Sequence, residues 1–156
     1  MKKWYAVAVG AVVVGMSVCS FADHIWNFET SGSYQGWTDF NNRMTDSVSS
    51  GTLSYAINTQ MDPQWRQTSG LSSLDAGENI AFKVVVRRIT GVALAKTQFY
   101  VNEKLIGAVA MENNNDWQTL TFLYTGGTAA RISLLRFDPA SGQNGEWEIK
   151  SISAVQ

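Results

Sequence analysis

Hydrophobic and polar residues alternate along much of the chain, and no segment after residue 22 keeps the spacing of an amphipathic helix. In residues 78–90, Ile80, Phe82, Val84 and Val86 fall on one side of such an alternation. Successive side chains of a β-strand point to opposite faces, so this segment predicts a strand with one buried face. Further strands are predicted at 24–28, 52–58, 92–102, 105–111, 116–124, 131–137 and 146–154.

About eight strands joined by Gly, Asn, Asp and Ser clusters predict an all-β domain, a two-sheet antiparallel β-sandwich of the jelly-roll type. Asn102-Glu103-Lys104 has the composition of a tight hairpin loop. Residues 30–50 and 59–77 lack a clear alternation and are predicted to be long irregular loops. Since loops often carry recognition residues, these two segments are the first places to look for a site.

The beginning of the chain has the pattern of a secretory signal peptide. Lys2 and Lys3 precede an uncharged run at 4–18, which is followed by Ser20-Phe21-Ala22. The apolar core at 6–18 is shorter than the roughly 20 residues that a membrane-spanning helix needs. We therefore expect a signal peptide at 1–22, a single mature domain at 23–156 beginning with Asp23, and a periplasmic or secreted location. Lipidation of Cys19 is the alternative, although Val18 stands where that processing requires a small residue.

Without the leader the chain has no cysteine, ten basic residues and 13 acidic ones, a net charge of −3. This balance argues against nucleic acid or an anionic membrane as a partner. It leaves the oligomeric state open. Five tryptophans remain, and such a content suits a thick sandwich core, a sugar-stacking surface, or both.

Catalytic machinery is hard to find in the sequence. His24 is the single histidine, and no nucleophile or phosphate-binding motif is present. Glu146 and Glu148 are two residues apart in a predicted strand, so their carboxylates share a face as a glycosidase pair could. The alternative is that both are strand charges or metal ligands. We predict a non-enzyme and keep a small polysaccharide lyase or glycoside hydrolase as an alternative.

The tryptophans differ in their surroundings. Trp65 lies in a polar segment beside Arg66 and Gln67, whose side chains can bond to hydroxyl groups, so we expect these three residues to contact a ligand. Trp37 either joins them or plugs one end of the sandwich, and Tyr34 is a further candidate. The tryptophans that fall in predicted strands are expected in the core: Trp26, Trp117 and Trp147.

Short motifs at both ends and in the middle of the mature chain resemble a known family. They are Trp26-Asn27-Phe28-Glu29 with Gly36-Trp37, Asp116-Trp117, the segment 135–139, and the segment 145–152. Together they resemble carbohydrate-binding-module-like (galactose-binding-like) jelly-roll domains of secreted bacterial proteins. The resemblance implies a β-sandwich that recognises a glycan by aromatic stacking without cleaving it. A structural or protein-interaction sandwich with no sugar site is the alternative, because one fold hosts many functions.

The same resemblance implies one structural calcium ion, which in similar sandwiches joins the first and last strands through oxygen ligands. Glu29 and Glu148 would be its first ligands, with Asp138 and Glu146 in reserve. Lys150 stands where many relatives carry aspartate, and this departure favours the alternative that these acids are ordinary surface charges.

Overall fold

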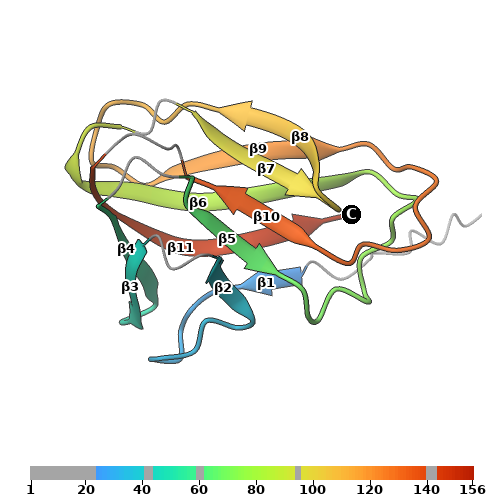
Figure 1. Cartoon of the computed structure of the whole chain (residues 1–156), viewed down its shortest axis with the longest axis horizontal. Helices are drawn as coiled ribbons and strands as arrows, with labels where there is room; N and C mark the ends of the chain where they lie inside the picture. The colour runs from blue at the N-terminus through green and yellow to red at the C-terminus, as the bar shows by residue number, and fades with distance from the viewer. Residues whose placement is uncertain (1–23, 41–43, 59–61, 94–95, 140–143) are drawn as a thin grey trace, which may run out of the picture.

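Two antiparallel β-sheets pack face to face in the computed structural model, which describes residues 24–40, 44–58, 62–93, 96–139 and 144–156 (Figure 1). The predicted leader and its cleavage site at Asp23 lie outside these residues. The two-sheet antiparallel β-sandwich expected from the sequence is confirmed. The described segments contain no helix that is long and apolar enough to cross a membrane.

Six strands form the first sheet, sheet A. They are, in spatial order, β3 (Met44–Ser49), β4 (Thr52–Ile57), β11 (Gly145–Val155), β6 (Ile80–Gly91) and β9 (Gln118–Tyr124), with β1 (His24–Trp26) paired to β11. β6 and β11 are the longest strands and pair along almost their whole length. This pair forms the centre of the sheet.

Five strands form the second sheet, sheet B. Their spatial order is β2 (Trp37–Phe40), β5 (Gln64–Gln67), β10 (Leu135–Asp138), β7 (Thr97–Val101) and β8 (Lys104–Val109). In Figure 1, β5, β10 and β7 lie in front of the long strands of sheet A. All pairings within this sheet are antiparallel.

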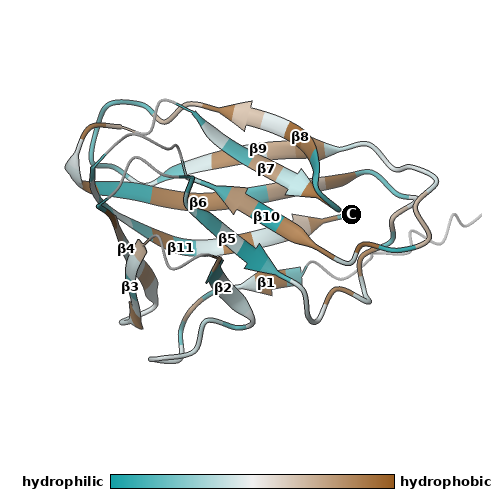
Figure 2. Ribbon diagram, viewed as in Figure 1, coloured by the Kyte–Doolittle hydropathy of each residue, from teal (hydrophilic) through white to brown (hydrophobic). Residues whose placement is uncertain are grey.

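The core lies between the sheets, where alternate residues of each strand point inward. Ile80, Phe82, Val84 and Val86 of β6 are all buried, which confirms the alternation predicted for this segment. The same alternation appears as bands of hydrophobic and hydrophilic colour along the strands in Figure 2. Phe99 of β7 stacks on Phe82 across the two sheets, with ring centroids 4.9 Å apart. Aromatic packing therefore joins the two layers.

Eleven strands are present in the described residues instead of about eight. The three additional strands, β2, β3 and β5, all fall in the segments 30–50 and 59–77 that were predicted to be irregular, so that prediction is wrong. Two of these strands are only four residues long, which is too short for alternation to be recognised in the sequence. Their pairing with neighbouring strands specifies them instead.

The turn between β7 and β8 confirms the hairpin predicted there. Asn102 and Glu103 both have positive φ, 48° and 62°. Two consecutive residues in this region are typical of the type I′ turn, whose twist matches that of paired strands. The hairpin places Glu103 beside the outer surface of sheet B, where its carboxylate contacts two arginines.

Candidate functional site

The outer surface of sheet B carries a connected group of aromatic and charged side chains, which we call the network face. Short strands build it by alternation: in β5, Trp65 points into the core while Gln64 and Arg66 point outward. The cross-strand register places Arg66 opposite Arg136 of β10, and Arg136 opposite Tyr100 of β7. The members of the network face are Phe40, Asp62, Gln64, Arg66, Tyr100, Glu103, Arg136 and Asp138.

Arg136 is the centre of the network face. Its guanidinium donates two hydrogen bonds to the two oxygens of Asp138, and the bond from Nε to Oδ1 is 2.6 Å long. The same group lies 4.5 Å from the ring centroid of Tyr100 and contacts Asp62 at 3.1 Å and Glu103 at 3.5 Å. Two-point bonding to a carboxylate fixes the plane of a guanidinium. Arg136 is therefore held in one orientation over the Tyr100 ring.

Arg66 forms a second, similar cluster on the network face. Its Nε and one terminal nitrogen donate to Oε1 of Gln64 at 3.0 and 2.8 Å, and its other terminal nitrogen contacts Glu103 at 3.0 Å. The guanidinium carbon lies 3.8 Å from the ring centroid of Phe40, which is 42% exposed. Gln64 also donates to Asp62 at 2.6 Å. Hydrogen bonds thus run from one cluster to the other.

Burial sets the electrostatics of this surface. Asp138 is only 2% exposed, and this burial raises the pKa of its carboxyl to about 6, although Arg136 acts in the opposite direction. Burial and the charge of Asp138 also raise the pKa of Tyr100, so this phenol stays protonated at neutral pH. At neutral pH the network face carries two guanidinium groups and three carboxylates, each paired with an opposite charge.

Such a surface is suited to binding rather than to chemistry. Fixed guanidinium, amide and carboxylate groups can exchange hydrogen bonds with ligand hydroxyls, and the rings of Phe40 and Tyr100 add apolar surface. The buried carboxyl of Asp138 has a raised pKa, as a general acid would need, but both of its oxygens are already bonded to Arg136. The network face therefore presents recognition groups without a free acid–base pair.

The prediction that Trp65 lies in an exposed loop is wrong. Trp65 occupies the second position of β5 and is 0% exposed, so its indole has no surface on which a sugar could stack. Gln67 is buried as well, and its amide bonds to the carbonyl of Gln35 at 2.7 Å and to Ser69. Arg66 alone of these three predicted contacts reaches the outer surface. Because β5 is only four residues long, no alternation in the sequence could have shown that Trp65 and Gln67 face the core.

Trp37 and Tyr34 pack on the core side of the same region. Trp37 is buried, in agreement with the alternative that it plugs the sandwich, and its ring meets that of Trp26 edge to face at 5.5 Å. Tyr34 is half-buried against Trp65 and donates to Asp46 at 3.1 Å. Gly36, beside them, has a φ of +89°, and a Cβ atom there would lie 2.7 Å from Oε1 of Gln67. These residues shape the edge of the sandwich.

Among the tryptophans expected in the core, Trp26 and Trp147 are buried as predicted, whereas Trp117 is not. Trp117 immediately precedes β9, is 36% exposed, and lies under the guanidinium of Arg87 on the outer surface of sheet A. The expectation of a core position is wrong. Leu120 and Phe122 of β9 face the core, so alternation along the strand turns Trp117 to the outer surface. The network face also contains residues that were not predicted as site residues from the sequence: Phe40, Asp62, Gln64, Tyr100, Glu103 and Arg136.

The four predicted calcium ligands do not come together. Asp138 lies on sheet B bonded to Arg136, whereas Glu148 lies on sheet A bonded to Arg87 at 2.7–2.8 Å. Glu29 is exposed after β1, and Glu146 lies on β11. Within the described segments, no group of three or more His, Cys, Asp or Glu side chains could hold a metal ion. This arrangement does not fit the expected ligand set, and calcium binding stays a prediction.

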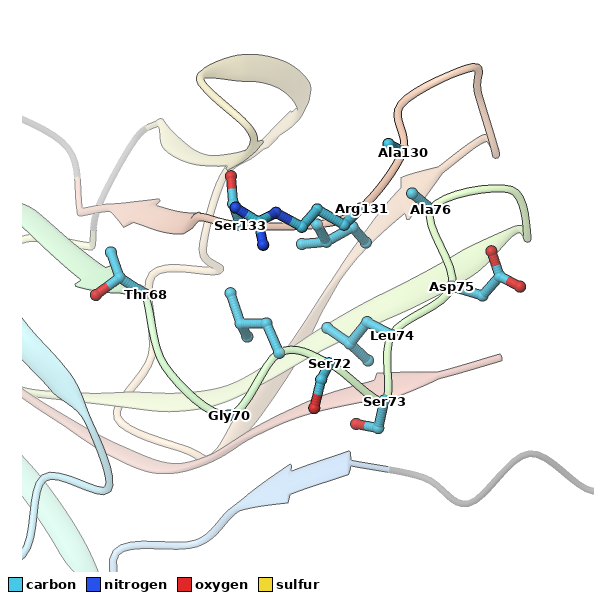
Figure 3. A pocket seen from close by; sticks show the side chains of 12 residues that line it. Thr68, Gly70, Ser72, Ser73, Leu74, Asp75, Ala76, Ala130, Arg131 and Ser133 are labelled. Carbon is cyan, nitrogen blue, oxygen red and sulfur yellow. The ribbon is translucent and has the colours of Figure 1, made fainter.

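A cavity of about 830 Å3 opens at one end of the sandwich, between the segments 68–76 and 130–133. Leu71, Leu74 and Ile132 are buried within it, and serines line its rim. Figure 3 shows the Arg131 side chain extending along the cavity, while the Asp75 carboxylate points away from it. No aromatic ring lines this cavity, so it lacks the stacking surface that the network face has.

Solved structures of carbohydrate-binding modules share this fold. The chain aligns with a structure described as BiXyn10A CBM1 in its apo form, with a TM-score of 0.62 and 16% identity over 85% of this chain and 96% of that one. A CBM29-2 mutant complexed with mannohexaose aligns with a TM-score of 0.56 and 13% identity over 85% and 89% of the two chains.

A third similar structure contains the CBM22-1 and GH10 modules of Clostridium thermocellum xylanase 10B complexed with xylohexaose. Its TM-score is 0.60 at 13% identity, over 88% of this chain and 28% of the longer one. No protein-family model and no curated protein matches the chain. The structural similarity therefore shows a fold: this chain is a β-sandwich of the kind found in carbohydrate-binding modules.

Proposed function

We propose that this chain is an exported, non-catalytic carbohydrate-binding module that holds a glycan on the network face. The observation that carries the proposal is the pairing of two aromatic rings, Phe40 and Tyr100, with two guanidinium groups that are fixed by their own acidic partners. Aromatic rings bind the apolar faces of sugars, and the fixed polar groups bind the hydroxyls between them. A periplasmic or secreted location follows from the leader-like sequence at 1–22.

The charge of the network face favours a neutral glycan. Both arginines are already paired, and the three carboxylates of Asp62, Glu103 and Asp138 exceed them by one. A uronic acid or sulfated sugar would have to displace one of these acids from its guanidinium. A neutral sugar can instead add hydrogen bonds to groups that keep their pairing, which makes it the better match.

Isothermal titration with xylohexaose and with mannohexaose, the ligands in two of the similar structures, tests the proposal. The Phe40→Ala variant should weaken binding about tenfold, or about 1.4 kcal/mol, because one apolar contact is lost. Its melting temperature should change little, since Phe40 is an exposed side chain. The Arg136→Lys variant should also weaken binding, because lysine keeps the charge but cannot form the two-point contact with Asp138.

Leu123→Ala is the matched control for this titration, because Leu123 is an exposed hydrophobic residue on β9 of the other sheet. It should bind both oligosaccharides as the parent does. Equal affinity of the parent, Phe40→Ala and Arg136→Lys proteins would move the site off the network face. Absence of binding by the parent to both oligosaccharides and to a panel of neutral polysaccharides would favour the alternative of a structural or protein-interaction domain.

A further inference from the structure

The outer surface of sheet A, on the opposite side of the sandwich from the network face, holds the one tryptophan of the described segments that is exposed. Trp117 immediately precedes β9, and the guanidinium of Arg87 of β6 lies 4.6 Å from its ring centroid. Arg87 in turn contacts Glu148 of β11 through two nitrogens at 2.7 and 2.8 Å. Glu148 of β11, Arg87 of β6 and Trp117, the residue before β9, thus form a single connected row.

This row is set by the sheet and is not a chance surface contact. Glu148 is the register partner of Arg87, and the adjacent pair Val86 and Gln118 places Trp117 next to Arg87 on β9. The ion pair and the cation–π contact restrict the indole and the guanidinium to one arrangement. A ligand that stacks there would not have to order these side chains, and this preorganisation favours affinity.

A second cavity, of about 420 Å3, continues the row across β11, β4 and β3. Glu148 belongs to both the row and the cavity. The other outward-facing side chains that line the cavity are mostly small and hydroxylated or acidic: Thr45, Ser47, Ser54 and Glu146. From β3 to β9 the surface crosses four strand spacings, a width of roughly 19 Å. It is wide enough for an elongated ligand rather than a single small molecule.

The chemistry of this surface selects the class of ligand. The hydroxyl and carboxylate groups of the row and the cavity accept hydrogen bonds, and Arg87 in the row is neutralised by Glu148. Lys83 of β6 and Lys150 of β11 lie on the same outer surface but do not line the cavity. An acidic ligand would meet the carboxylate of Glu146 in the cavity, whereas an apolar protein surface would leave the hydroxyls and carboxylates of the cavity without hydrogen-bond partners. A ligand rich in hydroxyl donors with an apolar face for Trp117 matches all of these groups.

We propose that the outer surface of sheet A is a second binding site for a neutral glycan, with Trp117 as its stacking platform and the cavity at β3, β4 and β11 as its polar half. The two sites then lie on opposite sides of one rigid sandwich. One molecule can hold two polysaccharide chains, or two segments of one chain, and thereby cross-link them. This second site stands on its own residues and does not depend on the network face.

Fluorescence quenching of Trp117 tests the site directly. The full chain has six tryptophans. The part of the acrylamide-quenched fluorescence that is present in the parent and missing from a Trp117→Phe variant therefore comes from Trp117. Xylohexaose, mannohexaose and soluble neutral polysaccharides are added as probes. We expect at least one probe to reduce the quenching of Trp117 in the parent and equally in the Phe40→Ala variant, whose network face is impaired. A Glu146→Gln variant should need about tenfold more probe for the same protection.

If no probe protects Trp117 while titration detects binding that Phe40→Ala weakens, the second site is refuted and the network face stands. If protection disappears in Phe40→Ala as well, Trp117 senses the network face and the second site is also refuted. Protection that survives Phe40→Ala supports the second site even where the network face binds nothing.

Cross-linking supplies an independent measurement. The parent should make a solution of the protecting polysaccharide turbid, and light scattering should return to the level of the polysaccharide alone with either Phe40→Ala or Trp117→Ala. Both variants should still bind the polysaccharide through their remaining site in affinity electrophoresis. Turbidity that persists in Trp117→Ala overturns the second site, because two chains would then be held without it. Leu123→Ala, an exposed change near the other end of β9, is the control and should cross-link as the parent does.

Discussion

At the scale of single residues, strand alternation decides which side chains of the segment 64–67 lie on the outer side of sheet B and which face the core. Gln64 and Arg66 belong to the network face, where Gln64 is buried beneath its partners, while Trp65 and Gln67 face the core. Trp65 packs edge to face with Tyr55 and stacks beside Tyr34. Trp65 fills the space between the sheets, and the adjacent Arg66 is the residue that a ligand could contact.

Substitution of two tryptophans should therefore have opposite effects on stability. Trp65→Ala should lower the free energy of unfolding by about 3–5 kcal/mol, the range for removing a large core aromatic. Trp117→Ala should lower it by about 1 kcal/mol or less, the size of an exposed cation–π contact. Chemical denaturation of both variants measures this difference. Equal losses in the two proteins would contradict the burial that distinguishes them.

Asp138 should make stability depend on pH in an unusual direction. Its pKa is raised by burial to about 6, above the value near 3.9 of an unfolded chain, so the folded state binds the proton more tightly. Its contribution to stability is therefore complete below about pH 4 and is lost as the pH rises through about 6. Carboxyl NMR titration should find this pKa directly. Between pH 4 and 7, the stability of the parent relative to Asp138→Asn should fall, and a constant difference would contradict the raised pKa.

At the scale of elements, the β7–β8 hairpin is tied to the segment that leads into β10. The side-chain oxygen of Asn102 accepts from the backbone of Ser133 and Leu134 at 2.8 and 3.2 Å, and its nitrogen donates to the carbonyl of Arg131 at 2.9 Å. Asn102 also has a positive φ. One residue thus closes the turn and holds a distant segment in place. This contact helps to keep β7 and β10 in the register that sets Tyr100 opposite Arg136.

Two substitutions separate these roles of Asn102. Asn102→Ala should destabilise the fold by about 1–3 kcal/mol, because it loses the hydrogen bonds and also strains a backbone with positive φ. Asn102→Gly loses the same bonds but tolerates the turn, so its loss should be smaller. Thermal melting of both variants shows which of them is the less stable. A glycine variant as unstable as the alanine variant would mean that backbone conformation contributes little at this turn.

At the scale of the whole molecule, the two sheets pack face to face and leave two broad outer surfaces with different chemistry. The network face of sheet B holds two paired arginines and two aromatic rings. The surface of sheet A holds Trp117, the Arg87–Glu148 ion pair and a hydroxyl-lined cavity. Because a single hydrophobic core holds the sheets together, the two surfaces keep a constant separation. This rigidity is what would let a bivalent module link two chains.

The sequence by itself determined the class of fold and much of the core. Long alternating segments such as 80–91 and 145–155 mark their buried residues without further information, since the period of a strand is two. The turn at Asn102 and Glu103 was also predictable, because few residues tolerate positive φ. These features depend on local patterns that extend over enough residues to be read in the chain.

Only the tertiary structure decided where the short strands lie and which residues meet across them. β2 and β5 are four residues long and are specified by pairing with distant partners, as Trp65 is by Asp39 and Phe137. Arg66 and Arg136 are 70 positions apart in the chain but opposite each other in the sheet. The burial of Trp65, the exposure of Trp117 and the separation of the four expected metal ligands all follow from such long-range pairing, which no local pattern records.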